Sequence, residues 1–171
     1  MDRHRCSIPA AITLLRAAAA PLFYQLFLHR SCAVAFAVFL FAAMTDILDG
    51  MVARRLSATS AFGAYLDVIV DFLLIVTAFA AFVQKQWYCA LIVVPVVISF
   101  AIFLISSGVG RPLYDPVGKY LGSFCMGMIL VTLLVPDATV RKVLTYTLAG
   151  FFTVSLLSRG LHLRRRAVNG R

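Results

Sequence analysis

Six long apolar stretches constrain the fold of this 171-residue chain more than any other feature. They lie at about residues 8–28, 32–53, 61–83, 87–105, 120–135 and 143–157. A helix of about 20 residues crosses about 30 Å of hydrocarbon. Only 13% of the chain is charged, which is far below the share in soluble domains. We therefore predict an all-α integral membrane protein with six transmembrane helices, and we exclude a disordered chain or an ordinary soluble globule.

The basic residues indicate how the predicted bundle is oriented in the membrane. Eleven of the 16 Lys and Arg residues lie in the two tails and in the connections at 54–60 and 106–119, and four lie in the other connections. Cytoplasmic connections carry such an excess, so we expect both termini on the cytoplasmic side of the cell (inner) membrane. We expect residues 1–171 to form one multi-pass transmembrane domain, with the first stretch retained as a span. Anionic lipids and phosphorylated substrates are the expected partners, and nucleic acid is not.

The acidic residues are few, and most of them lie inside apolar stretches. The chain has seven Asp and no Glu, and four of the Asp residues fall between positions 46 and 71. Acids within membrane spans are costly and are usually functional. At 100° per residue, Asp49 lies about 60° from Asp46, and Asp71 lies about 40° from Asp67, so each pair shares one helix face. The short connection between these helices predicts antiparallel neighbours, with the four carboxylates meeting just below the cytoplasmic surface.

Four carboxylates this close repel one another unless they are protonated or bind cations. Oxygen ligands favour hard cations such as Mg²⁺, Mn²⁺ or Ca²⁺, and four Asp suffice for two ions with one carboxylate bridging. Such a pair suits phosphoryl transfer, because it neutralises a pyrophosphate and stabilises the attacking and leaving oxygens. Gly50 and Gly63 would let a substrate approach the backbone, and Arg54 is a suitable phosphate partner. A proton or ion path is the alternative interpretation of the same cluster.

The spacing of the cluster matches a known pattern. Residues 46–71 read D-x2-D-G-x2-A-R-x8-G-x3-D-x3-D. This resembles the signature of the CDP-alcohol phosphatidyltransferase family at every specified position. Residues 7–16 are similar to the family's opening helix, which usually reads N-x-P-N-x-x-T-x-x-R. Thr13 and Arg16 match that helix, whereas Ser7 and Ala10 replace its polar amides.

The resemblance implies an activity and a set of residue roles. Members of the family transfer the lipid phosphate of a CDP-linked lipid to an alcohol at the cytoplasmic face and release CMP. By this resemblance, two divalent cations, Mg²⁺ or Mn²⁺, would be ligated by Asp46, Asp49, Asp67 and Asp71. Asp71 would also be the catalytic base for the acceptor hydroxyl. The CDP-lipid would be bound by residues of the first three spans and their connections, namely Ala10, Thr13, Gly50, Ala53, Arg54, Ser60 and Gly63.

The acceptor alcohol is less constrained. Arg111, Lys119 and Arg159 lie at the expected cytoplasmic ends of the last three spans, where they would form a basic pocket for a phosphorylated acceptor. Alternatively, these residues only set the topology and touch lipid phosphates. Residues 115–119 are similar to a stretch of phosphatidylglycerophosphate synthases. We therefore favour CDP-diacylglycerol as donor and glycerol 3-phosphate as acceptor, giving phosphatidylglycerophosphate, with inositol phosphate, serine and phosphatidylglycerol as alternative acceptors.

Two other classes of membrane protein also place acids within spans. A polyprenyl transferase would need a second Asp-rich motif, which this sequence lacks. A non-enzymatic ion-conducting protein would leave Gly50, Arg54 and Gly63 without a role. Release of CMP from a CDP-lipid separates the favoured enzyme from both classes. The resemblance also implies a homodimer, for which the sequence shows no interface.

Overall fold

The computed structural model is all-helical over the residues that it describes, and it has no β-strand there. The backbone is described for residues 3–29, 31–56, 61–108 and 118–169, and the side chains for 14–29, 31–45, 66–102, 104 and 120–158. The described elements are α1 (Arg3–His29), α2 (Cys32–Leu56), α3 (Ala61–Gln84), the 3-10 helix η1 (Ala90–Ile92), α4 (Val93–Gly108), α5 (Gly118–Leu134) and α6 (Ala138–Asn169). The prediction of an all-α fold is confirmed.

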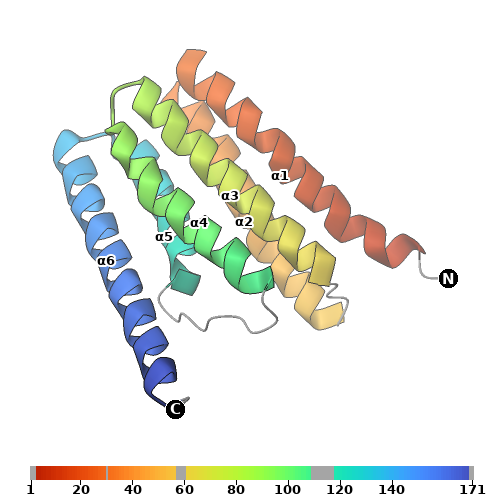
Figure 1. Cartoon of the computed structure of the whole chain (residues 1–171). Coiled ribbons are helices and arrows are strands. Elements are labelled where there is room, and N and C mark those ends of the chain that lie inside the picture. Colours follow the sequence, from red (N-terminus) through yellow and green to blue (C-terminus); the bar gives the residue numbers. More distant parts are fainter. Residues whose placement is uncertain (1–2, 30, 57–60, 109–117, 170–171) are drawn as a thin grey trace.

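Successive helices run up and down in one bundle, so that α1 begins and α6 ends at the same end of it (Figure 1). α1 packs against both α2 and α3, and α5 packs against α2, α3 and α6. In the described part of the chain, α2 and α3 each pack against α1 and α5 more than against one another. The close pairing of the second and third spans at their acidic ends stays a prediction, because the side chains of residues 46–65 fall outside the described residues.

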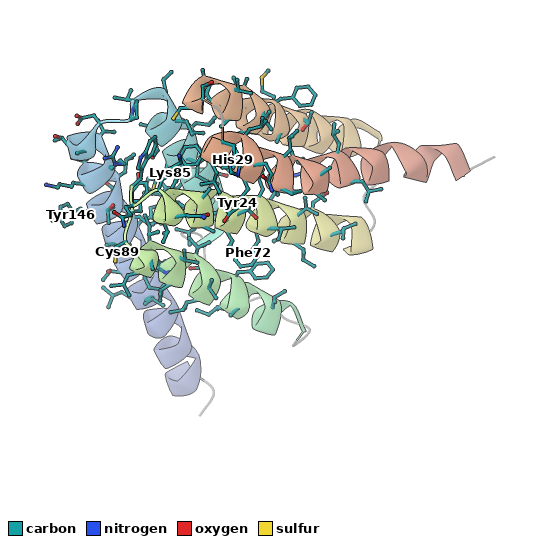
Figure 2. All side chains as sticks on the ribbon, turned by 90° about the horizontal axis from the view of Figure 1, so that it is seen from above. Tyr24, His29, Phe72, Lys85, Cys89 and Tyr146 are labelled. Carbon is teal, nitrogen blue, oxygen red and sulfur yellow. The ribbon has the colours of Figure 1, made fainter. Side chains whose placement is uncertain are left out.

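Two of the described helical segments are long and apolar enough to cross a membrane, Leu66–Gln84 and Ala138–Ser158. Shorter apolar segments occur at Cys32–Thr45, Ala90–Ile102 and Tyr120–Leu134. α6 is the most outlying helix in Figure 1, and Tyr146 points away from the bundle in Figure 2, with 76% of its surface exposed. Large apolar side chains on this face, such as Val143 and Leu157, are also exposed, as expected of a surface that faces lipid.

The first helix is longer and more regular than its sequence indicates. The sequence pattern has Arg16 and Pro21 interrupting the first apolar stretch, yet α1 continues through both residues. Proline is tolerated within membrane helices, where neighbouring groups satisfy the carbonyl that loses its partner. Arg16 is accommodated because it pairs with acids of another helix.

The last helix begins earlier and ends later than the predicted span at 143–157. The apolar stretches at 120–135 and 143–157 leave residues 136–142 as a connection, but α6 already starts at Ala138. The Asp137 carboxylate caps it, because it accepts hydrogen bonds from the backbone N–H groups of Thr139 and Val140, at 2.7 and 3.2 Å. These hydrogen bonds hold the pKa of Asp137 below its usual value. At the other end the helix extends to Asn169, so it includes most of the basic tail.

Aromatic packing fixes the end of the bundle opposite the start of α1. Phe27 of α1 meets Phe82 of α3 and Trp87 of the following turn edge-on, with ring centroids 5.1 Å apart in each case. Arg141 of α6 lies 5.1 Å from the centre of the Trp87 ring. The Tyr88 and Thr132 hydroxyls are 2.7 Å apart, which ties this turn to α5. These contacts tie α1, α3, α5 and α6 together at one end of the bundle, while the acidic motif lies toward the other.

Candidate functional site

The central feature of the site is a buried arginine that bridges two of the predicted metal ligands. Arg16 of α1 is only 1% exposed. Its Nη1 atom lies 2.5 Å from Asp71 Oδ1, and its Nη2 atom lies 3.0 Å from Asp67 Oδ1. One guanidinium therefore donates to both carboxylates, which are 51 and 55 residues away along the chain.

The local structure explains how one side chain reaches both acids. Asp67 and Asp71 are four residues apart on α3, so they lie one above the other on a single helix face. The run of alanines at 17–20 allows α1 to approach its neighbours closely, and Ala20 is fully buried. The guanidinium has a planar fork of N–H donors, which lets its two terminal nitrogens hold separate carboxylates at a fixed distance from each other.

The two carboxylates are partly exposed, whereas the arginine is buried. The side chains of Asp67 and Asp71 are 34% and 28% exposed. Arg16 contacts each of them through one oxygen, Oδ1. The acids are therefore held by Arg16 from inside the bundle, and their side chains are about one third exposed.

The other two acids of the motif lie on α2, and their side chains fall outside the described residues. Asp46 and Asp49 are ten and seven residues before the end of α2 at Leu56, which corresponds to about 10–15 Å along the helix. Asp67 and Asp71 are six and ten residues after the start of α3 at Ala61, or about 9–15 Å. Because α2 and α3 run in opposite directions, this spacing places both acid pairs at similar depths (Figure 1).

The chemistry of these side chains fits a divalent cation. Carboxylate oxygens are the preferred ligands of Mg²⁺ and Mn²⁺, and Asp67 and Asp71 present two carboxylates from one helix face. Among the side chains that the structure describes, no three acidic, His or Cys residues gather as a metal-binding group. Asp67 and Asp71 are thus two ligands of the kind that a divalent cation prefers, while the side chains of Asp46 and Asp49 fall outside the described residues.

The remaining predicted residues are distributed as follows. Arg111 and Ser60 lie outside the described residues. The others lie on described helices, but their side chains are not described: Ala10 and Thr13 on α1, Gly50, Ala53 and Arg54 on α2, Gly63 on α3, Lys119 on α5 and Arg159 on α6. Lys119, next to the start of α5, and Arg159, ten residues before the end of α6, belong to the same half of the bundle as the acid pairs (Figure 1).

Arg16 is the residue to which sequence reasoning gave no role. It was matched to the family's opening helix, but no contact was predicted for it. The signal was nevertheless present, since an arginine within an apolar span is expected to face the bundle interior and to pair with acids. Its partners could not be identified from sequence, because four acids were available at similar depths.

Comparison with known proteins defines the class. Residues 6–155 match the family model of the CDP-alcohol phosphatidyltransferases, and the chain belongs to this family. A CDP-diacylglycerol–glycerol-3-phosphate 3-phosphatidyltransferase of Pseudomonas fluorescens is 43% identical over 83 residues. The protein of that name from Cereibacter sphaeroides is 47% identical over 76 residues. A CMP-forming cardiolipin synthase of Oryza sativa is 39% identical over 72 residues.

These similarities are local. The matched segments cover 47%, 42% and 40% of this chain, and 43%, 34% and 22% of the three relatives in the same order. The chain is thus matched to less than half the length of each of these curated proteins. The family assignment rests on the model that spans residues 6–155.

Proposed function

We propose that this chain transfers a phosphatidyl group from CDP-diacylglycerol to glycerol 3-phosphate, with release of CMP. The observation that carries the proposal is the Arg16–Asp67–Asp71 cluster, because the buried guanidinium of Arg16 pairs with two acids of the family motif. Family membership supports the type of reaction. The names of the relatives from Pseudomonas fluorescens and Cereibacter sphaeroides support glycerol 3-phosphate as the acceptor.

The reaction makes one P–O bond and breaks another. The acceptor hydroxyl attacks the phosphorus that carries the diacylglycerol, and the bond from that phosphorus to the CMP oxygen breaks. The hydroxyl proton passes to Asp71, which acts as the general base. Two divalent cations held by Asp46, Asp49, Asp67 and Asp71 would supply charge neutralisation for the pyrophosphate and for the departing CMP.

Within this proposal, Arg16 is a positioning residue. It holds Asp67 and Asp71 through separate nitrogens, so the base and its neighbouring ligand keep a fixed relative position. Gly50, Ala53, Arg54, Ser60 and Gly63, with Ala10 and Thr13 of the first helix, would bind the CDP group beside this cluster. The family resemblance supports these assignments.

We also propose six membrane spans with both termini in the cytoplasm and the acids near the cytoplasmic face. The up-and-down course of the helices and the excess of basic residues at the end where α1 begins support this arrangement. α4 has 16 residues and α5 has 17, so they are about 24 and 26 Å long. These lengths suit a bilayer whose hydrocarbon layer is slightly thinner than usual. One domain over residues 1–171 and a homodimer complete the proposal.

Transfer to lipid tests the choice of acceptor. We expect purified protein with Mg²⁺ or Mn²⁺ to convert labelled glycerol 3-phosphate into an organic-soluble product in the presence of CDP-diacylglycerol. Labelled serine, inositol, inositol 3-phosphate and phosphatidylglycerol serve as the comparison set. Exclusive conversion of one of these other acceptors would leave the family intact and refute the choice of glycerol 3-phosphate.

The basic residues at the cytoplasmic ends of the last spans give a prediction about acceptor binding. Replacing Arg111 or Arg159 with alanine should raise the KM for the phosphorylated acceptor by about tenfold or more, because a charge-assisted hydrogen bond to phosphate is lost. The KM for the CDP-lipid should change much less. Steady-state kinetics with each substrate varied in turn measures both constants.

Arg141 provides the matched control, since it lies at the other end of the bundle, over the Trp87 ring. Its replacement with alanine should leave the acceptor KM unchanged. Equal increases of both KM values in the Arg111 and Arg159 variants would show that these residues set topology or touch lipid, and that the basic acceptor pocket does not exist.

A further inference from the structure

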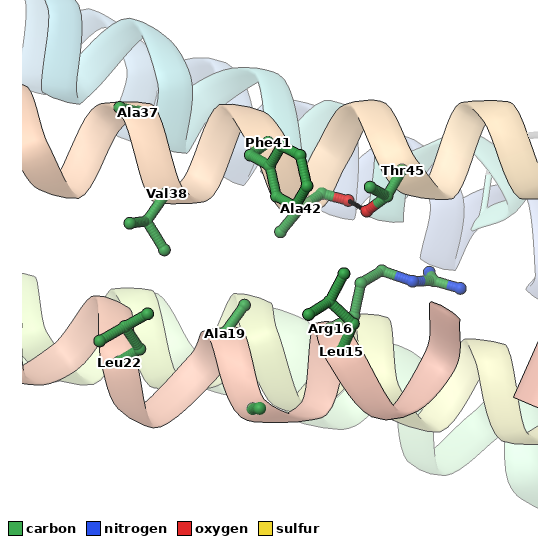
Figure 3. A pocket seen from close by; sticks show the side chains of 10 residues that line it. Leu15, Arg16, Ala19, Leu22, Ala37, Val38, Phe41, Ala42 and Thr45 are labelled. Carbon is green, nitrogen blue, oxygen red and sulfur yellow. Dashed lines mark hydrogen bonds between the residues drawn. The ribbon is translucent and has the colours of Figure 1, made fainter. Parts of the chain in front are cut away.

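A groove of about 340 Å³ runs between α1 and α2 on the outer side of the bundle (Figure 3). Four of its ten lining residues are alanines, and most of the others are large apolar side chains. The lining residues are Leu15, Arg16, Ala18, Ala19, Leu22, Ala37, Val38, Phe41, Ala42 and Thr45. The volume falls within the range of small-molecule binding sites.

The groove opens outward, toward what would be membrane lipid. Leu15, Leu22 and Phe41 on its rims are each about half exposed, whereas Ala42 on its floor is buried. The hydroxyl of Thr45 donates to the carbonyl of Ala42 at 2.8 Å, so it is satisfied by its own helix. The walls therefore present almost only apolar surface, which suits a hydrocarbon occupant.

One end of the groove reaches the functional site. Arg16 and Thr45 lie at the same end of it in Figure 3. Arg16 holds Asp67 and Asp71, and Thr45 immediately precedes Asp46 in α2. The groove is thus polar only where it adjoins the motif acids, as a site for an amphiphile with a phosphate head would be.

The length of the groove corresponds to one leaflet. From Arg16 to Leu22 the helix rises about 9 Å, and from Ala37 to Thr45 it rises about 12 Å. Half of a hydrocarbon layer about 30 Å thick is about 15 Å. A chain lying in the groove would therefore run from the acids toward the middle of the membrane.

We propose that this groove binds one acyl chain of the CDP-linked diacylglycerol and so steers the pyrophosphate to the acids. The inference rests on the proposed function, since it names the place of that donor's lipid tail. Because lipid tails are as apolar as the groove, the groove would hold the acyl chain by close packing. It aligns the donor along α1 and α2, with its phosphates beside Arg16 and Asp46.

Filling the far end of the groove tests the proposal kinetically. We expect Ala37→Leu to raise the KM for dioleoyl CDP-diacylglycerol about tenfold, equivalent to about 1.4 kcal/mol, because the long chain must take another path. The KM for the dihexanoyl donor should change little, since its short chains end before Ala37. Ala18→Leu, nearer the acids, should affect both donors.

The matched control is Ala80→Leu, which places the same side chain at an exposed position of α3 outside the groove. It should leave both KM values unchanged, because leucine is at home in lipid. The same KM values in the Ala37 and Ala80 variants would overturn the proposal.

Photo-crosslinking gives a readout that is independent of turnover. A CDP-diacylglycerol with a diazirine in one acyl chain should label residues 15–22 and 37–45, and Ala37→Leu should abolish that labelling. Labelling confined to other helices would overturn the inference, as would equal labelling of the groove by a diazirine phosphatidylcholine. Labelling of the groove without any CMP release would instead retain the binding site and refute the proposed reaction.

Discussion

Replacing Asp71 with asparagine is expected to lower kcat by about 10²–10⁴-fold, which is the usual contribution of a general base. The amide has nearly the same shape as the carboxylate but cannot accept the acceptor's proton. The variant should still fold, because the amide oxygen can accept a hydrogen bond from Arg16, and Asp67 retains its ion pair. CMP release under saturating donor and acceptor measures the effect, and a melting curve in detergent verifies the fold.

Asp137→Asn is the matched control for this change. Asp137 caps α6 just before its apolar segment Ala138–Ser158, and asparagine is an equally good cap. Its replacement should leave kcat unchanged. A kcat of the Asp71→Asn protein within about threefold of the wild-type value would remove Asp71 from the role of base, since a lost base costs at least about 10²-fold.

The second large effect is expected at Arg16. Arg16→Met keeps the bulk of the buried side chain but removes the charge that lies between Asp67 and Asp71. Removing one partner of a buried ion pair costs about 3–5 kcal/mol, and the partial exposure of the two acids favours the lower part of this range. Because the two acids are no longer fixed, kcat/KM should fall by about 10²-fold or more.

Divalent cations should distinguish positioning from mere stability. In Arg16→Met the two acids lose their internal cation, so Mn²⁺ should raise the melting temperature of the variant more than that of the wild-type protein. Arg16→Lys retains the charge but lacks the fork, and we expect it to recover stability better than activity. If Mn²⁺ shifts both proteins equally and the Lys variant is fully active, Arg16 is a structural residue only.

The sequence was sufficient for the elements whose signals are local. The α-helical class follows from apolar stretches of span length, and the shared face of Asp67 and Asp71 follows from their spacing of four residues. The apolar stretches at 61–83 and 87–105 leave residues 84–86 as a connection, and the structure has a turn at Lys85 and Gln86. These features depend only on residues that are close together along the chain.

Features that depend on packing were not predictable in the same way. The pairing of Arg16 with Asp67 and Asp71 joins residues more than 50 positions apart, and it depends on how α1 packs against α3. The groove likewise depends on how α1 and α2 pack, because residues of both helices line it. The early start of α6 had a local signal in Asp137, but its capping role was overlooked because the polar residues after Pro136 resembled a loop.

The most direct test of the central claim is CMP release from CDP-diacylglycerol by the purified full chain with Mg²⁺, measured with and without glycerol 3-phosphate. The account predicts that release requires the divalent cation, is stimulated by glycerol 3-phosphate, and is lost in the Asp71→Asn protein. Release that persists in the presence of a chelator or in that variant would contradict it, as would the absence of CMP release from a folded wild-type protein supplied with every acceptor of the comparison set.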